Sequence, residues 1–439
     1  MKEIKRSAPQ VMFYDGAAVA GHLEKMAAKG WLLSDAGNYI WTYRKIAPQA
    51  LRFTATYFSE ASAFDPGLTS DQQALIGYCE AAGWTFAAQW SKMLLFWTAD
   101  EHATPIETDE AMKLKIIHKS QKGTFLTGNL LVFPMAALQF WMIGSNFFDD
   151  PVQWLANGLW PLLLLLWVVL LGSTAIRLIG YAQWYFRSKR AVDQGGVCVS
   201  VGPFWRYSET VLLAVLTPLL LVWLALAFRQ DSGPALWLSL GGVAVVMAAA
   251  WGVKTVLKRR GASRAKNRNA TFAVILILSV VSAAILPIFI LNGGLRSSDP
   301  TAEDLPLVAE DLTGTRPDGS GRYRWRERAA PLMRYCYAMQ YSDAGDVGYE
   351  IAVPGLSAFY GLCRQWALTL SEYEADDCRW VETDPAPWGA AAAYEKLRDG
   401  EGQGEYVLCF PDRVVKAEFY HWDLTPEQMG VAGEKLREA

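Results

Sequence analysis

Histidine and cysteine are scarce in this sequence, and their spacing limits the chemistry that it can carry. The four histidines (His22, His102, His118 and His421) lie far apart, and no CxxC or HExxH pattern groups metal-binding side chains. No Walker loop, dinucleotide-binding fingerprint or GxSxG motif occurs either. We therefore expect no catalytic residue, no metal site and no cofactor, and we do not expect an enzyme.

Ionisable side chains are also absent from five long apolar stretches. Each stretch is about as long as a helix that crosses the hydrocarbon core of a membrane. The stretches are 124–147, 154–175, 211–228, 235–253 and 272–291. Ion-coupled carriers need ionisable groups at membrane depth, so uphill transport by this chain is disfavoured. The sequence predicts a multi-pass protein of the cell membrane with a five-helix transmembrane bundle over residues 123–292.

The charges of the connections predict the orientation of this bundle. Lys and Arg gather before the first span, between the second and third, and in the segment Lys254–Asn269, whereas the other two connections hold one basic residue between them. Basic connections stay on the cytoplasmic side. Met1–Gln10 is polar, so no cleavable signal is expected. We expect residues 1–122 in the cytoplasm and the carboxy-terminal part outside it.

A face of small residues in the fourth span and the basic loop after it indicate what this part of the chain can bind. Ala244, Ala248 and Gly252 share one helical face, which permits close packing against another span of the same chain or against a second copy. The seven Lys and Arg residues of Lys254–Asn269 attract anionic membrane lipid by about 1 kcal/mol per charge. No aromatic residues are interleaved there, so direct nucleic-acid binding is not expected.

The amino-terminal part contains a similar pattern twice. A helix that Asp15 caps ends at Gly30, and Trp31 opens a hairpin; a second helix, which begins with a Thr69/Gln72 capping box, ends at Gly83 before Trp84. Residues 1–122 are therefore expected to form an α+β domain of two helix-Gly-Trp-hairpin repeats. Trp31 and Trp84 are predicted as core anchors, with an interaction role as the alternative.

The acidic segment "DEHATPIETDE", Asp100 to Glu110, is the best local candidate for chemistry. Its carboxylates and His102 could bind a divalent cation, but their spacing fits no defined coordination loop. A solvated linker with Thr108 as the cap of an acidic helix start explains the segment equally well.

Several motifs of this part together carry a resemblance. "HLEKMAAKGWLL", "YIWTYRK", "LRFTATYF", "YCEAAGWTF", "KMLLFWT" and "TPIETDEAMKLKII" resemble the bacterial family called domain of unknown function 2812, over about Phe13 to Lys122. The resemblance implies a cytoplasmic domain ahead of membrane helices, in genes near regulators of the PadR type. It therefore implies a cytoplasmic regulatory protein as a partner, and it implies no activity.

The part after the last span is expected to be a linker (293–330) and a small extracytoplasmic α+β domain (331–439). Pro331–Gln340 and Gly355–Leu370 are predicted helices, "EYVLCF" and "RVVKAEFY" a hairpin, and Thr425 with Gln428 the capping box of a final helix. Four cysteines fall on the oxidising side and permit disulfides in three pairings: Cys336, Cys363, Cys378 and Cys409.

Two functional hypotheses follow. The first is a regulatory or signal-transducing membrane protein, in which the outer domain meets a ligand and the cytoplasmic domain binds a protein. The second is a scaffold or accessory subunit of a membrane transport or envelope-assembly complex. The sequence does not predict an oligomeric state.

Overall fold

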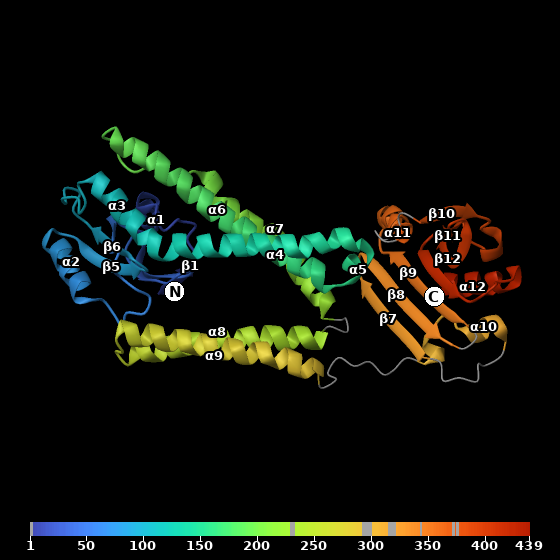
Figure 1. The fold of residues 1–439 in the computed structure, drawn as a ribbon. Helices are drawn as coiled ribbons and strands as arrows, with labels where there is room; N and C mark the ends of the chain where they lie inside the picture. The colour runs from blue at the N-terminus through green and yellow to red at the C-terminus, as the bar shows by residue number, and fades with distance from the viewer. Residues whose placement is uncertain are drawn as a thin grey trace. The chain divides into compact units, whose positions relative to one another are not determined.

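The computed structural model describes residues 3–228, 233–291, 301–314, 322–342, 345–370, 374 and 377–439. Sheets lie in the amino-terminal and carboxy-terminal parts of the chain, and long helices lie between them (Figure 1). The chain packs as two units, one of residues 1–138, 167–218 and 239–285, the other of residues 139–166, 219–238 and 286–439. Each of the five long helices contributes to both units.

The amino-terminal domain contains two three-stranded antiparallel sheets and three helices. The elements are β1 (Ile4–Ser7), α1 (Gly16–Ala28), β2 (Trp31–Ala36), β3 (Trp41–Lys45), β4 (Arg52–Tyr57), α2 (Ser70–Ala81), β5 (Thr85–Trp90), β6 (Met93–Thr98) and α3 (Glu110–Gln121). The strand orders are β1-β3-β2 and β4-β6-β5. Helix α1 packs on both sheets, against β2 and β4.

Local signals set the ends of the first two helices as predicted. The Asp15 side chain accepts a hydrogen bond from the Ala18 amide, and Thr69 and Gln72 form a reciprocal capping box. Gly30 and Gly83 follow the helix ends with φ angles of +81° and +86°, a conformation in which a side chain is strained. Each glycine therefore lets the chain reverse into a hairpin.

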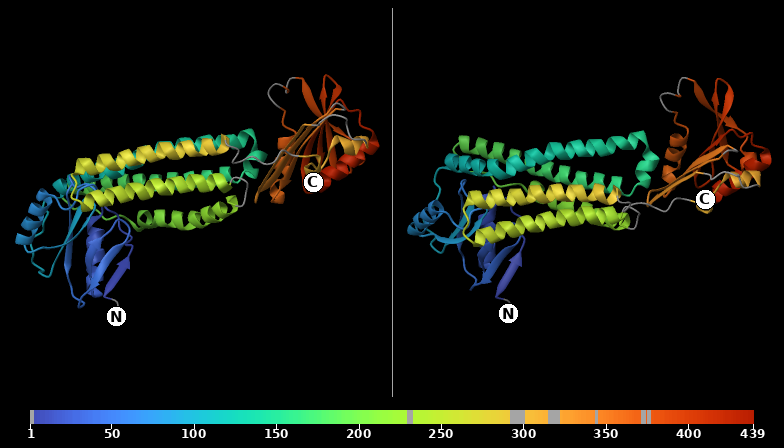
Figure 2. Two further views of the ribbon diagram at one scale, coloured as in Figure 1. Left: turned by 90° about the horizontal axis from the view of Figure 1, so that it is seen from below. Right: turned by 60° about the horizontal axis from the view of Figure 1, so that its bottom comes forward.

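Five helices are long and apolar enough to span a membrane: Thr127–Asp149, Leu159–Asp193, Pro203–Ala227, Trp237–Arg259 and Arg264–Ile285. They belong to α4 (Thr127–Asp149), α6 (Leu159–Asp193), α7 (Pro203–Ala227), α8 (Gly233–Arg259) and α9 (Arg264–Leu291). Large apolar side chains are exposed along all five helices, as expected for helices that face lipid. The multi-pass prediction is confirmed, and α8 and α9 run side by side (Figure 2).

The helices differ from the predicted stretches at their ends. Helix α6 extends well beyond the apolar stretch, to Asp193, and a short helix α5 (Pro151–Ala156) separates α4 from α6. Helix α3 continues through a π-helical turn, η1 (Lys122–Leu126), into α4 without a break. Residues 229–232 of the connection between α7 and α8 lie outside the described part of the chain.

The carboxy-terminal domain is built on one seven-stranded antiparallel sheet of order β10-β11-β12-β13-β9-β8-β7. Its strands are β7 (Arg322–Ala330), β8 (Met333–Tyr341), β9 (Asp346–Pro354), β10 (Cys378–Thr383), β11 (Ala392–Arg398), β12 (Glu401–Cys409) and β13 (Val414–Tyr420). Helices α10 (Ala309–Thr313) and α12 (Pro426–Glu438) pack on one face of the sheet. Helix α11 (Tyr360–Ala367) packs on β9 and β13.

The structure corrects three expectations about local structure. Pro331–Gln340 is not helical, because Met333–Tyr341 forms β8 between β7 and β9. The segment 293–330 is not simply a linker, because α10 and β7 belong to the domain; residues 292–300 and 315–321 lie outside the described residues. The cap of α3 is Asp109 rather than Thr108. The β12–β13 hairpin and the Thr425 capping box are confirmed.

The four cysteines of the carboxy-terminal domain are buried free thiols in the structure. Cys336 belongs to the core beneath α10 and α12, whereas the Cys363 sulfur lies 3.6 Å from the Met333 sulfur. Disulfide formation among Cys336, Cys363, Cys378 and Cys409 stays a prediction.

Candidate functional site

The candidate site is the connector between α6 and α7, residues 194–202. Its residues 196–202 form neither helix nor strand, so their backbone groups need partners from elsewhere. The amino-terminal domain supplies two of these partners as carboxylates. The connector therefore joins that domain to the ends of two membrane helices.

Asp15 holds the connector and caps a helix at the same time. One carboxylate oxygen, Oδ1, accepts from the Ala18 amide at 3.0 Å, and the other, Oδ2, accepts from the Val201 amide at 2.7 Å. The side chain is 2% exposed, and the Arg206 guanidinium lies 3.9 Å from Oδ2. A buried carboxylate that accepts amide hydrogen bonds makes stronger bonds than a neutral acceptor.

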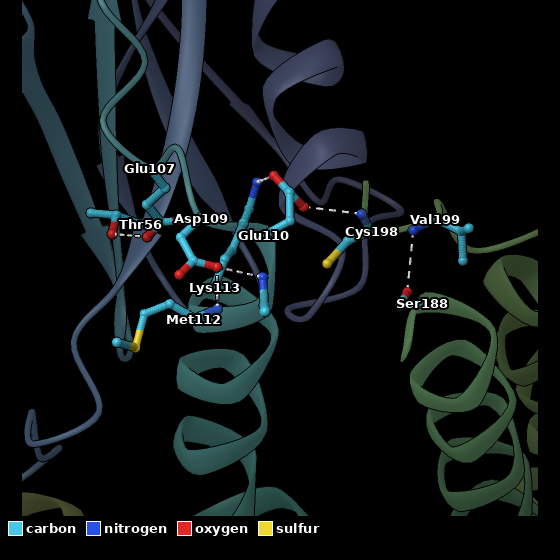
Figure 3. Close-up of polar contacts among 10 residues, drawn as sticks. Thr56, Glu107, Asp109, Glu110, Met112, Lys113, Ser188, Cys198 and Val199 are labelled. Carbon is cyan, nitrogen blue, oxygen red and sulfur yellow. Dashed lines mark hydrogen bonds and ion pairs between the residues drawn. The ribbon is translucent and has the colours of Figure 1, made fainter. Parts of the chain in front are cut away.

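Glu110 makes the second carboxylate contact, from the first turn of α3 (Figure 3). Its Oε2 accepts from the Cys198 amide at 3.0 Å, and its Oε1 lies 3.1 Å from the Lys113 ammonium group. Burial acts to raise the pKa of Glu110, but the Cys198 amide and Lys113 outweigh it, so this pKa is lowered. The side chain therefore holds the connector as a carboxylate.

The helices themselves satisfy other backbone groups of the connector. The Ser188 hydroxyl accepts from the Val199 amide at 3.2 Å, and the Trp184 indole donates to the Val199 carbonyl at 2.7 Å. Beside them, Tyr14 contacts the Tyr181 and Trp184 rings, with centroids 5.1 and 4.9 Å away. Tyr14, Tyr181, Trp184 and Val201 belong to one core that also contains α1 and its sheet.

A second contact joins the amino-terminal domain to α8 and α9. The Arg264 guanidinium donates to the Glu60 carbonyl at 2.9 Å, and the buried Asn267 amide donates to the Phe64 carbonyl at 3.2 Å. Lys254 lies over the Phe64 ring, 5.3 Å from its centroid. Part of the basic loop is thus engaged by the amino-terminal domain.

The acidic segment 100–110 divides among separate roles. Glu107 accepts from the Thr56 hydroxyl, Asp109 caps α3 and Glu110 binds the connector (Figure 3). Within the described residues, no group of three or more His, Cys, Asp and Glu side chains is placed to hold a metal ion. Burial raises the pKa of the Cys198 thiol to about 12, and Glu110 adds to the rise, so the thiol stays protonated and is a poor nucleophile.

The two predicted anchor tryptophans occupy different surroundings. Trp84 is 3% exposed in a core with Ile76, Leu94 and Phe96, and its indole donates to the Thr104 carbonyl at 2.8 Å. Trp31 is half-buried, and the Lys5 ammonium group lies 5.7 Å from its ring centroid. Trp84 is therefore inaccessible to a partner, whereas part of Trp31 can be reached.

The small residues of α8 are not covered in the structure. Ala244 and Ala248 are exposed, and a methyl group added at Gly252 would meet no atom within 4 Å. The close approach of α8 to α9 occurs at Gly242 instead, where an added methyl group would lie 3.3 Å from Ser282. The face of Ala244, Ala248 and Gly252 is therefore open to lipid or to another chain.

Sequence reasoning did not find the connector contacts. Asp15 was assigned only as a cap, and Glu110 only as part of an acidic segment. Their connector partners lie 186 and 88 residues away, and no local pattern encodes such a pairing. The glycine-containing stretch "QGGVCVSVG" between two apolar helices is the one local signal for this connector.

Comparison with known proteins assigns a family to the amino-terminal part alone. Residues 20–128 match the family described as "Protein of unknown function (DUF2812)". No curated protein and no solved structure matches the chain. The chain thus has five helices long and apolar enough to span a membrane, and its amino-terminal part matches this family, as the motifs predicted.

Proposed function

We propose that the chain is a regulatory membrane protein that carries a change in its outer domain through the helices to a cytoplasmic domain that binds a protein. The observation that carries the proposal is the anchored connector, because Asp15 and Glu110 tie the amino-terminal domain to the loop between two spans. A movement of α6 against α7 would strain both hydrogen bonds. The unbroken passage from α3 into α4 supplies a second rigid link.

The proposal includes an orientation and a kind of partner. The basic connections favour a cytoplasmic amino-terminal domain and an outer carboxy-terminal domain. The cytoplasmic partner is a regulatory protein, as the family resemblance implies, and direct binding to nucleic acid is not part of the proposal. The chain has no catalytic activity or cofactor of its own.

The test uses the full chain and a variant in which only the connector contacts are lost. Asp15→Asn with Glu110→Gln keeps the size of both side chains but removes both negative charges. Partners are captured by cross-linking in native membranes, and transcripts are compared with those of a strain that lacks the chain. We expect a soluble regulator to be cross-linked by the wild-type chain, and the variant to alter transcripts as the deletion does.

Glu80→Gln is the matched control, because this side chain is exposed on α2 of the same domain. This control should behave as the wild-type chain. Capture of membrane subunits alone, with transcripts unchanged in the deletion strain, would contradict the regulatory proposal.

That outcome would support a second candidate, a scaffold or accessory subunit of a membrane transport or envelope-assembly complex. The uncovered face of Ala244, Ala248 and Gly252 on α8 favours this candidate, since small residues let another helix approach closely. A subunit cross-linked through α8 would identify it.

We also propose that the two helix–hairpin units of the amino-terminal domain are related copies. Each has a positive-φ glycine before its tryptophan, and each hairpin has a register shift at the same distance after it, at Leu33/Asp35 and Phe86/Ala88. Matching irregularities support duplication more strongly than matching strands do, because bulges are specific local features.

A further inference from the structure

One face of the edge strand β7 carries a row of arginines. Arg324, Arg326 and Arg328 alternate along the strand, and their cross-strand neighbours on β8 are Met339, Tyr337 and Tyr335. Successive residues of one strand face lie about 6.6–6.8 Å apart. Arg324 and Arg326 are exposed, and Arg328 is half-buried. The row therefore places three positive charges within about 13 Å.

The opposite face of the same strand has a different composition. Tyr323 and Trp325 pack on the core beneath α10 and α12, and Glu327 forms an ion pair with Arg334 at 2.8 Å. The Glu327 carboxylate thus forms its ion pair on the face opposite the arginine row. It does not neutralise the positive charge of that row.

The arginine row forms no ion pair within the described residues, although the Asp150 charge acts on Arg328 at longer range. Among the described residues, no carboxylate lies within 4.0 Å of a guanidinium nitrogen of Arg324, Arg326 or Arg328. Burial and then the charge of Arg326 lower the pKa of Arg328, so the neighbouring arginines repel each other. An anion between them would relieve this repulsion.

A groove of about 580 Å³ lies along β7, where two of the three arginines line it together with Tyr323 and Trp325. Its lining includes Arg324, Arg326, Tyr335, Tyr337 and Gln153. Glu350 also lines it, but the Tyr335 hydroxyl donates to this carboxyl at 2.8 Å. Burial raises the pKa of Glu350 and likewise that of Asp150 nearby, so the ionised form of each is less favoured than in water.

The groove also lies beside the end of a membrane span. The Arg328 guanidinium is 3.5 Å from the Gln153 side-chain oxygen, and Gln153 is on α5, four residues after the last residue of α4. Helix α5 packs on β7 and β8. The headgroup layer begins where the hydrocarbon core ends. Arg328 thus contacts the short helix that directly follows the candidate span α4.

We propose that the arginine face of β7 binds the phosphate headgroup of an anionic phospholipid in the leaflet where α4 ends. Guanidinium groups donate paired hydrogen bonds to phosphate oxygens, and Tyr337 and Gln153 border the same groove. The hydrocarbon tails stay in the membrane beside α4. Bound lipid thereby fixes the edge of the sheet against the membrane surface.

The test places the full chain in nanodiscs that contain a photoreactive phosphatidylglycerol with its reactive group near the headgroup. After illumination, mass spectrometry measures labelling of peptides from residues 322–341. We expect labelling of these peptides with phosphatidylglycerol and little with the matching phosphatidylcholine probe. Arg324→Gln with Arg326→Gln should lower labelling at least about tenfold, since each basic residue near an anionic surface contributes substantially.

Arg334→Gln is the matched control, because it removes one arginine from the opposite face of the same hairpin. This variant should keep the wild-type labelling. Readout by peptide separates this site from the basic loop at Lys254–Asn269. Thermal midpoints of both variants show that they are folded.

Three results would overturn the proposal. Equal labelling by the two lipids would remove the role of negative charge. Unchanged labelling in the double variant, with aggregation of that variant, would mean that the arginines only protect an exposed strand edge. Complete competition by soluble glycerol phosphate would reassign the groove to a free phosphate ligand.

Discussion

At the scale of single residues, Glu107 is a carboxyl group that the fold buries at some cost. The Thr56 hydroxyl donates to Oε1, but Oε2 is inaccessible and has no hydrogen-bond partner within the described residues. Burial raises the pKa of Glu107 above its usual value. The ionised form is therefore disfavoured in the folded chain.

This burial predicts that Glu107→Gln stabilises the protein at pH values above the raised pKa of Glu107. In the wild-type chain the free energy of unfolding falls as pH rises through the raised pKa, because the unfolded chain ionises at a lower pH. Above the raised pKa, we expect the free energy of unfolding of the variant to exceed that of the wild type by about 1 kcal/mol. Below the ordinary pKa of a glutamate, we expect no difference. Thermal unfolding of the purified full chain from pH 4 to pH 8 measures this.

Glu101→Gln is the control, since that side chain is exposed and should have little effect at any pH. A stability difference for Glu107→Gln that does not change with pH would contradict the argument from ionisation.

The acidic segment shows what composition can and cannot predict at this scale. Six ionisable residues within eleven positions suggest a metal site. In the structure, however, Glu107 makes a buried contact with Thr56, Asp109 caps α3 and Glu110 binds the connector. Their directions depend on where α3 begins and on a loop far away in sequence. Spacing alone therefore could not separate these roles.

At the scale of elements, the connector depends on side chains for its backbone hydrogen bonds, and Asp15→Asn tests this. Asn caps a helix as well as Asp does, so α1 should be unchanged. Its amide cannot accept from Val201 while its oxygen accepts from Ala18. We expect hydrogen–deuterium exchange at residues 198–202 to be about tenfold faster, as for a loss of about 1.4 kcal/mol.

Exchange in α1 peptides is the internal reference, and Asp35→Asn on an exposed strand position is the control variant. Faster exchange throughout α1 would mean that the cap was lost. Unchanged exchange at residues 198–202 would mean that Asp15 does not hold the connector.

Elements with strong local signals could be predicted, whereas one with two covered faces could not. The caps at Asp15, Thr69 and Thr425 all formed as expected. Strand β8 was wrongly predicted as a helix because apolar or aromatic side chains occur on both of its faces, and the alternation that marks a half-exposed strand is missing. Only its pairing with β7 and β9 defines it as a strand.

At the scale of the whole molecule, five candidate spans predict that the two terminal domains lie on opposite sides of the membrane. The basic connections predict a cytoplasmic amino terminus. Asp71→Cys and Glu434→Cys place exposed thiols on the two terminal domains. An impermeant maleimide should label Glu434→Cys on intact spheroplasts and label Asp71→Cys only after the membrane is permeabilised.

The wild-type chain, with its native cysteines, gives the background of this labelling. If the maleimide labels Asp71→Cys before permeabilisation and Glu434→Cys only afterwards, the orientation is the opposite of the predicted one. Equal labelling of both variants before permeabilisation would contradict an odd number of crossings.

The shared core around Tyr14 also bears on how such a domain can be inherited. The family match begins at residue 20 and ends at residue 128, so it leaves out Tyr14, Asp15, Trp184 and Val201. These residues nevertheless complete the core and the polar contacts of the domain. A recombination event that moved only the matched segment to another protein would leave an apolar surface and a buried carboxylate uncovered. The structural domain is therefore larger than the segment that matches the family.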